Sequence, residues 1–207
     1  MSLAQPRRVG MFGGAFDPPH NAHIALARAA VEQLGLDELR IFPTGQAWHK
    51  SRALSGGEHR LAMARLAFAG VPRAVVDERE LRRSGHTYTV DTLRELQAEL
   101  HTPKSPVQLL LVIGADQAEA LHTWREADEI ARIAIISIAA RARPTGAGGT
   151  FDASKLPAGR LEPVELPPMP FSSTEIRARA ATGAKIDDLV PVAVARYIEQ
   201  HHLYRTA

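Results

Sequence analysis

Short apolar segments alternate with amphipathic helical segments along most of this chain, and this alternation limits its fold more than any other feature. Val107–Ile113 (VQLLLVI) and Ile133–Ala139 (IAIISIA) are apolar at nearly every position. A strand is apolar throughout when both faces of its sheet are covered, as in parallel sheets. In Thr89–Leu100, by contrast, apolar residues recur every three or four positions, as on one face of a helix. The pattern predicts an α/β fold, with a parallel sheet and helices on both of its faces.

The pattern of apolar residues also predicts where the individual strands and helices lie along the chain. Strands are expected at Arg8–Phe12, Leu39–Pro43, Ala74–Asp77, Val107–Ile113, Ile133–Ala139 and Leu161–Leu166. Helices are expected at Ala22–Leu34, Glu58–Phe68, Thr89–Leu100, a short stretch before Trp124, Ala127–Arg132, Ser172–Ala181 and Pro191–His201. Residues 141–170 are rich in Pro and Gly, which predicts an exposed loop followed by the last short strand.

Length and charge restrict the classes of function. The chain has 207 residues and a formal net charge of +2, so charge does not indicate a general binder of nucleic acid or membrane surfaces. We expect neither partner, and the longest apolar run is far shorter than the ~18 residues that a membrane span requires. With a prior of ~150 residues per domain, we expect a single domain over residues 1–207, with residues 171–207 as its C-terminal helical part.

Cysteine is absent from the sequence. Disulfides, thiolate zinc sites and a cysteine nucleophile are therefore excluded. The absence is compatible with a reducing compartment, and we expect a cytoplasmic protein. The sequence leaves the oligomeric state open.

The segment GGAFDPPHNAH, residues 13–23, directly follows the first expected strand and opens the first expected helix. Ligands of open α/β sheets lie at the carboxyl ends of strands. The glycine pair permits close approach of the backbone to a phosphate, and the helix start offers free N–H groups to an anion. His20 and His23, three residues apart, can face the same side of that helix and donate hydrogen bonds to phosphate oxygens.

A second candidate anion site lies at FSSTEIR, residues 171–177. Ser172 and Glu175 have the spacing of a capping box, so a helix is expected to begin there. Hydroxyl groups, free N–H groups and Arg177 one turn into the helix together favour an anion. Taken alone, the Ser172–Glu175 spacing favours a plain helix cap over an anion site.

Taken in order, these segments resemble the HxGH nucleotidyltransferase superfamily, in particular the bacterial nicotinate-nucleotide adenylyltransferases. GGAFDPPHNAH is similar to GGTFDPxHxGH, with Ala15 and Ala22 in place of Thr and Gly, and FSSTEIR is similar to ISSTxIR. Residues 87–93 (TYTVDTL) resemble SYTxDTL, and Gly114, Asp116, Leu121 and Trp124 fit GxDxxxxLxxW. His49-Lys50 and Arg143-Pro144 also fall where that family has basic residues.

The resemblance implies a Rossmann-like fold of the nucleotidyltransferase type with a C-terminal helical extension. It implies that the AMP part of ATP is joined to nicotinate mononucleotide, giving deamido-NAD and pyrophosphate. The residues implied for catalysis are His20 and His23. The residues implied for ATP are Gly13, Gly14, Ala15, Phe16, His20, His23, Gly114, Ser172, Ser173, Thr174 and Arg177. Those implied for nicotinate mononucleotide are His49, Lys50, Tyr88, Thr89, Asp116, Trp124 and Arg143.

A phosphate nucleophile is already ionised at pH 7, so this reaction needs positioning and charge stabilisation rather than a strong base. Mg²⁺ is expected to accompany ATP, held by phosphates and water rather than by a protein cage. One alternative is another small adenylyl- or cytidylyltransferase of the superfamily, such as a phosphopantetheine adenylyltransferase. The other is a non-catalytic nucleotide-binding module.

Overall fold

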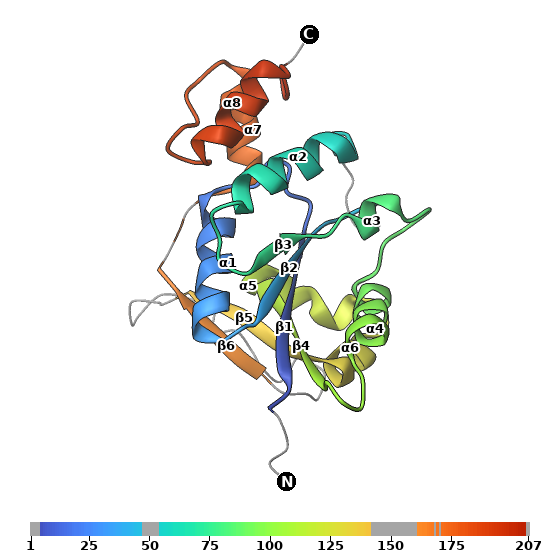
Figure 1. The fold of residues 1–207 in the computed structure, drawn as a ribbon. Helices are drawn as coiled ribbons and strands as arrows, with labels where there is room; N and C mark the ends of the chain where they lie inside the picture. The colour runs from blue at the N-terminus through green and yellow to red at the C-terminus, as the bar shows by residue number, and fades with distance from the viewer. Residues whose placement is uncertain (1–4, 47–53, 142–160, 168, 170, 206–207) are drawn as a thin grey trace.

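Six parallel strands form one sheet in the order β3-β2-β1-β4-β5-β6, with helices on both faces (Figure 1). The computed structural model describes residues 5–46, 54–141, 161–167, 169 and 171–205. The strands are β1 (Arg7–Gly14), β2 (Glu38–Pro43), β3 (Ala74–Val76), β4 (Val107–Gly114), β5 (Ala134–Arg141) and β6 (Leu161–Leu166). The helices are α1 (Asn21–Gln33), α2 (Gly57–Phe68), α3 (Arg79–Arg82), α4 (Thr89–Leu100), α5 (Ala115–Ala120), the 3-10 helix η1 (Leu121–Thr123), α6 (Ala127–Ile133), α7 (Ser173–Ala181) and α8 (Val192–Gln200). The predicted α/β fold is confirmed, and none of the helices in these ranges has the length and apolarity to cross a membrane.

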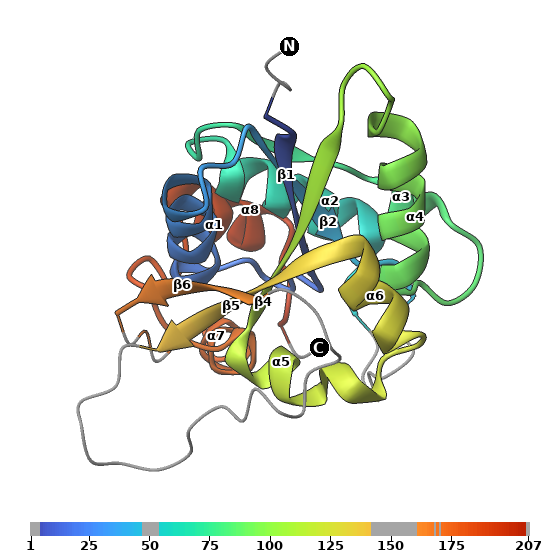
Figure 2. The same cartoon turned by 90° about the horizontal axis from the view of Figure 1, so that it is seen from below.

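Two hydrophobic cores lie on opposite faces of the sheet, and β4 contributes to both. Leu110 and Val112 belong to the core that contains α1 and α2, whereas Leu109 and Leu111 belong to the core that contains α4 and α6. All four side chains are buried. Each such side chain contributes roughly 1.5–3 kcal/mol by leaving water. Figure 2 shows α1 on one side of the sheet and α4 and α6 on the other, which explains why this strand is apolar at successive positions.

A crevice opens where β1 leaves β4. The pairing of β1 with β2 continues to Gly14 and Pro43, whereas its pairing with β4 ends at Met11 and Leu111. In this strand order the chain changes direction across the sheet between β1 and β4, which is the topological switch point of a Rossmann-like sheet. The last residues of β1 and β4 therefore lie on opposite sides of this crevice.

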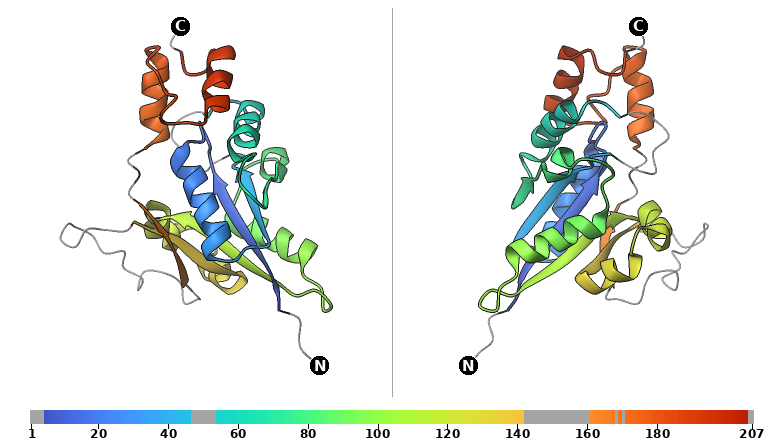
Figure 3. Two further views of the ribbon diagram at one scale, coloured as in Figure 1. Left: turned by 60° about the vertical axis from the view of Figure 1, so that its left-hand side comes forward. Right: turned by 90° about the vertical axis from the view of Figure 1, so that its right-hand side faces the viewer.

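The C-terminal helices lie at the carboxyl edge of the sheet, next to α2 (Figures 1 and 3). Ile176 of α7 and Val194 and Ile198 of α8 are buried in the same core as α1 and α2. Leu189, in the segment between the two helices, is buried there as well. This packing holds α7 close to the end of β1.

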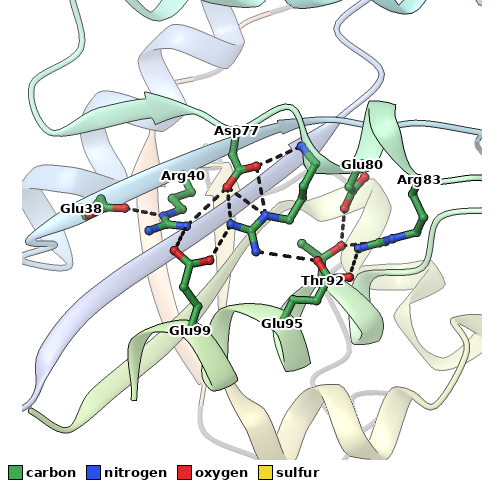
Figure 4. Close-up of polar contacts among 9 residues, drawn as sticks. Glu38, Arg40, Asp77, Glu80, Arg83, Thr92, Glu95 and Glu99 are labelled. Carbon is green, nitrogen blue, oxygen red and sulfur yellow. Dashed lines mark hydrogen bonds and ion pairs between the residues drawn. The ribbon is translucent and has the colours of Figure 1, made fainter. Parts of the chain in front are cut away.

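One helix, α3, was not expected from the sequence. It has four residues, too few to display helical periodicity, and ionic contacts hold it in place (Figure 4). Asp77 accepts hydrogen bonds from the backbone and the guanidinium of Arg79, the shortest at 2.6 Å. Glu99 of α4 accepts from Arg79 at 2.7 Å and from Arg40 of β2 at 2.8 Å. These bonds attach the segment before Tyr88 to the sheet and to α4.

Glu80 of α3 is a buried carboxyl at the inner end of this network (Figure 4). Its Oε1 accepts a hydrogen bond of 2.8 Å from the hydroxyl of Thr92. Arg83 donates to the same hydroxyl at 3.2 Å and to Glu95 at 2.7 Å. Burial is the largest influence and raises the pKa of Glu80 to about 7. The Thr92 bond and the charge of Arg83 oppose that rise, whereas Glu95 and Asp77 add to it.

Stability is expected to fall as the pH rises, because of Glu80. The folded chain holds this proton up to about pH 7, whereas the reference pKa of the carboxyl is 4.5. The stabilising contribution is therefore complete below pH 4.5 and disappears as the pH passes 7, a loss on the order of 3 kcal/mol. Urea unfolding between pH 5 and 8 should show wild type losing stability relative to Glu80→Gln, which cannot ionise. Parallel curves for the two proteins would contradict this account.

Candidate functional site

A cavity of about 830 Å³ occupies the crevice at the ends of β1 and β4. We call it the histidine cavity, because His20 and His23 lie in its wall. It is also lined by Gly13, Gly14, Ala15, Phe16, Ala22, Gly114, Asp116, Ser172, Ser173, Thr174 and Arg177. Every described residue that the sequence assigned to ATP is therefore in one cavity, and so are the two alanines that depart from the resembling motif.

The two histidines form a stacked pair at the start of α1. His20 is the N-cap residue and His23 lies in the first turn. Their ring centroids are 3.8 Å apart, at an interplanar angle of 28°. The His20 backbone N–H donates to Nδ1 of His23 at 3.2 Å. Because Nδ1 accepts this bond, a neutral His23 carries its proton on Nε2, where it can donate to a ligand.

His20 is held in its neutral form. The residue is 7% exposed, and burial lowers the pKa of its imidazole to about 4. Among the described residues, Nδ1 of His20 is buried and has no hydrogen-bond partner. Such an unpaired buried atom typically costs about 1–3 kcal/mol. A polar ligand atom beside this ring would remove that cost.

The start of α7 forms the opposite wall and is bonded to the segment that carries the histidines. Ser173 donates its hydroxyl hydrogen to the Pro18 carbonyl at 3.0 Å. Arg177 donates to the Asp17 carbonyl at 2.8 Å and to the hydroxyl of Thr174 at 3.0 Å. The two anion-favouring segments, which lie far apart in the sequence, therefore line one cavity and are hydrogen-bonded to each other.

Ser172 caps α7, as expected, because its hydroxyl oxygen accepts from the Glu175 N–H at 3.2 Å. The Glu175 carboxylate pairs with Arg179 at 2.7 Å.

Sequence reasoning missed a buried network beneath this wall. The Asp17 carboxylate accepts from the Tyr204 hydroxyl at 2.7 Å and from the Ser55 N–H at 3.2 Å. Burial, followed by the charge of Asp17, raises the pKa of Tyr204, so its hydroxyl keeps the proton that it donates. Arg60, also buried, donates to the Thr44 carbonyl at 2.6 Å and to the Ala15 carbonyl at 3.1 Å. No local pattern around Arg60 or Tyr204 indicates these partners.

A second cavity, of about 420 Å³, adjoins the first. We call it the tryptophan cavity, and the described residues that line it include Thr87, Tyr88, Thr89, Asp116, Trp124, Arg125 and Glu80. It shares Gly13, Gly14, Ala15, Asp116 and Gln117 with the histidine cavity. The two cavities are therefore adjacent compartments of one crevice, and they meet where β1 and β4 end.

Helix α4 begins at Thr89, as expected, and Tyr88 is its N-cap residue. Arg125 was not predicted as a site residue, yet its guanidinium carbon lies 4.7 Å from the centroid of the Tyr88 ring. His49, Lys50 and Arg143 lie outside the described residues.

The described part of the chain holds no group of three or more His, Asp or Glu side chains that could bind a metal ion. The charged groups beside the crevice are instead spread over separate elements, such as Asp116 of α5 and Arg177 of α7.

Comparisons with known proteins agree with this geometry. A model of the cytidylyltransferase-like family matches residues 11–179. The chain is 53% identical over 201 residues to a probable nicotinate-nucleotide adenylyltransferase of Albidiferax ferrireducens, covering 97% of this chain and 100% of that protein. It is 42% identical over 209 residues to a protein of the same name from Methylibium petroleiphilum, covering 99% and 95%.

Solved structures show the same fold at lower identity. The nicotinic acid mononucleotide adenylyltransferase of Plasmodium falciparum, complexed with NaAD, superposes with a TM-score of 0.75 at 20% identity, covering 96% of this chain and 97% of that one. A putative nicotinate-nucleotide adenylyltransferase from Vibrio parahaemolyticus superposes with a TM-score of 0.67 at 18% identity, covering 97% of both chains. With the family model and full-length relatives above 40% identity, the chain belongs to the nicotinate-nucleotide adenylyltransferase family of nucleotidyltransferases.

Proposed function

We propose that this protein transfers the adenylyl group of ATP to nicotinate mononucleotide, releasing pyrophosphate and forming deamido-NAD, a step of NAD biosynthesis. One observation carries the proposal: a histidine-lined and a tryptophan-lined cavity share Gly13 and Gly14, the last two residues of β1. A nucleotide in each compartment would bring its phosphate to these shared glycines. Two phosphates at one place are what an adenylyl transfer requires.

In this proposal ATP occupies the histidine cavity. The backbone at Gly13, Gly14 and Ala15 lies against its phosphates, and Gly114 borders the nucleotide from β4. The nucleophile is a phosphate oxygen of the mononucleotide, which attacks the α-phosphorus of ATP. A new P–O bond forms there as the bond to the pyrophosphate oxygen breaks. No base is needed, because the attacking phosphate is already ionised.

The side chains of the histidine cavity then serve to stabilise charge that spreads over the phosphate oxygens. Neutral His20 acts as a hydrogen-bond donor, and His23 donates from Nε2. Arg177, with the N–H groups and the hydroxyls of Ser172, Ser173 and Thr174 at the start of α7, faces the leaving pyrophosphate. Mg²⁺ would neutralise the triphosphate through phosphate and water oxygens, which fits the dispersed side chains around the crevice.

Nicotinate mononucleotide would occupy the tryptophan cavity. Its pyridine ring stacks on Trp124, and Tyr88 and Thr89 approach it from the start of α4, where no side chain among the described residues caps the helix. Asp116 accepts hydrogen bonds from ribose hydroxyls. We retain His49 and Lys50 for the phosphate of this substrate and Arg143 for a nearby anionic group.

We also infer that residues 1–207 act as a single domain, in which residues 171–207 complete the ATP compartment. The bonds from Ser173 and Arg177 to the histidine segment support this inference. So does the hydrophobic core that Ile176 and Val194 share with α1.

Pyrophosphate release with ATP and a panel of mononucleotides tests the proposed reaction. Nicotinate mononucleotide should be the most efficient acceptor, as judged by kcat/KM. Efficient use of phosphopantetheine, or no turnover with any acceptor, would overturn the assignment.

Replacing His23 by Ala should lower kcat by two or more orders of magnitude, because a donor to the transition-state oxygens is lost. The matched control is His101→Ala. This variant removes an exposed imidazole at the C-terminal end of α4, and His101 lines neither cavity. Circular dichroism should show that both variants are folded. Near-normal turnover by folded His23→Ala would remove this residue from the mechanism.

Replacing Trp124 by Ala should raise the KM for nicotinate mononucleotide about tenfold, because the ring loses its stacking partner. The KM for ATP should change little. Trp124→Phe keeps an aromatic face and should retain most of the affinity. Equal increases in both KM values would argue against stacking.

A further inference from the structure

Phe16, in the wall of the histidine cavity, has a backbone conformation that residues other than glycine rarely adopt. Its φ is 47°, in the left-handed region, and the residue is 1% exposed. Its ring lies edge-on to the His23 imidazole, with the ring centroids 5.2 Å apart at an interplanar angle of 81°. A side-chain carbon at Gly14 would lie 2.9 Å from two carbons of the Phe16 ring, so the ring also packs closely on the backbone there. The Phe16 ring therefore forms one side of the space that the His23 imidazole occupies.

Hydrogen bonds on both sides of Phe16 hold this backbone. Before it, Arg60 donates to the carbonyl of the preceding residue at 3.1 Å. After it, the buried Asp17 carboxylate accepts from the Ser55 N–H at 3.2 Å and from the Tyr204 hydroxyl at 2.7 Å. A left-handed residue with a bulky side chain persists only where surrounding contacts fix it. The Tyr204 hydroxyl supplies the shortest of these three bonds.

The tail after α8 turns back and brings Tyr204 to this point. The Leu203 N–H donates to the Ile198 carbonyl at 3.0 Å, and both His202 and Tyr204 are left-handed, with φ of 50° and 68°. The Tyr204 side chain packs on the core that contains α1 and α2. Tyr204 lines neither the histidine cavity nor the tryptophan cavity. Any effect of its hydroxyl on a bound nucleotide therefore passes through Asp17.

We propose that Tyr204 is a positioning residue for adenylyl transfer: its hydroxyl holds Asp17, Asp17 keeps Phe16 left-handed, and the Phe16 ring fixes the His23 imidazole. The inference rests on the proposed function, in which His23 donates to phosphate oxygens. A displaced donor costs more in the transition state, where charge spreads over those oxygens, than in substrate binding. Loss of the hydroxyl therefore lowers kcat more than it weakens ATP binding.

The test is Tyr204→Phe, which keeps the ring on the core and removes the hydroxyl alone. Per folded molecule, kcat should fall about tenfold, whereas the KM for ATP should change by less than about threefold. The imidazole proton resonance of His23, identified by its absence from the NMR spectrum of His23→Ala, should also shift, because the aromatic ring of Phe16 moves relative to it. This second measurement needs no turnover.

The matched control is Tyr197→Phe, the same change on α8. The Tyr197 hydroxyl lies 3.0 Å from Nδ1 of His59, its ring centroid lies 4.1 Å from that of His201, and Tyr197 lines neither cavity. This variant should keep kcat within about twofold of wild type. It should move the resonances of His59 and His201 but not that of His23. An equal loss of kcat in Tyr197→Phe would reduce the effect to packing of the C-terminal helices and overturn the proposal.

Combining Tyr204→Phe with Asp17→Asn tests the path through Asp17. Asp17→Asn weakens the acceptor, so by itself it should lower kcat and shift the His23 resonance, which keeps the path testable should Tyr204→Phe fail to fold. Because both changes act on the same bond, the double variant should lose little more activity than the more affected single variant. Losses that multiply would show that the hydroxyl acts by another path and overturn the proposal.

A normal kcat in folded Tyr204→Phe, or a lower kcat with an unmoved His23 resonance, would also overturn it. These failures are distinct from failure of the proposed function. If wild type adenylylates no mononucleotide, the reaction itself is wrongly assigned, whatever the His23 resonance does. If wild type is active and Tyr204→Phe is equally active, only the role of Tyr204 is wrong.

Discussion

All six strands of this sheet run in the same direction, so their carboxyl ends meet at one edge, and β1 and β4 part there. The pairing between them stops at Met11 and Leu111, and the chain beyond those residues forms the walls of the crevice. Gly13 and Gly14, which pair with β2 but have no partner in β4, line both cavities. The separation of these two strands therefore opens the space that the two cavities occupy.

Among the described residues that line the histidine cavity, few side chains carry a full positive charge. His20 is neutral because burial lowers its pKa to about 4, and the net charge of the whole chain is only +2. In the proposed function, the attraction for phosphate would come from oriented donors at the starts of α1 and α7, together with Arg177. Donors that are already oriented need no rearrangement as charge develops, which makes them effective in catalysis. The arrangement also explains why overall composition carries no sign of a site for anions.

Features with a local cause could be predicted from the sequence, and those with a distant cause could not. The buried strand at Val107–Gly114 and the cap at Ser172 follow from apolar runs and hydroxyl spacing, and both lie where the pattern places them. Helix α3 depends on Asp77 and on Glu99 of another helix, so its four residues carry no signal of their own. Arg60 holds the segment after β1 by donating to backbone carbonyl groups. Because every residue has a carbonyl group, the sequence around Arg60 does not indicate these partners.

The hydrogen bond between Tyr204 and Asp17 joins residues 187 positions apart. Because a chain is synthesised from its amino end, Asp17 leaves the ribosome long before its hydroxyl partner exists. The segment from Asp17 to His23 thus emerges without the α7 wall, and without the tyrosine that later holds its carboxylate. The sheet can assemble while synthesis continues, but the histidine cavity is completed last.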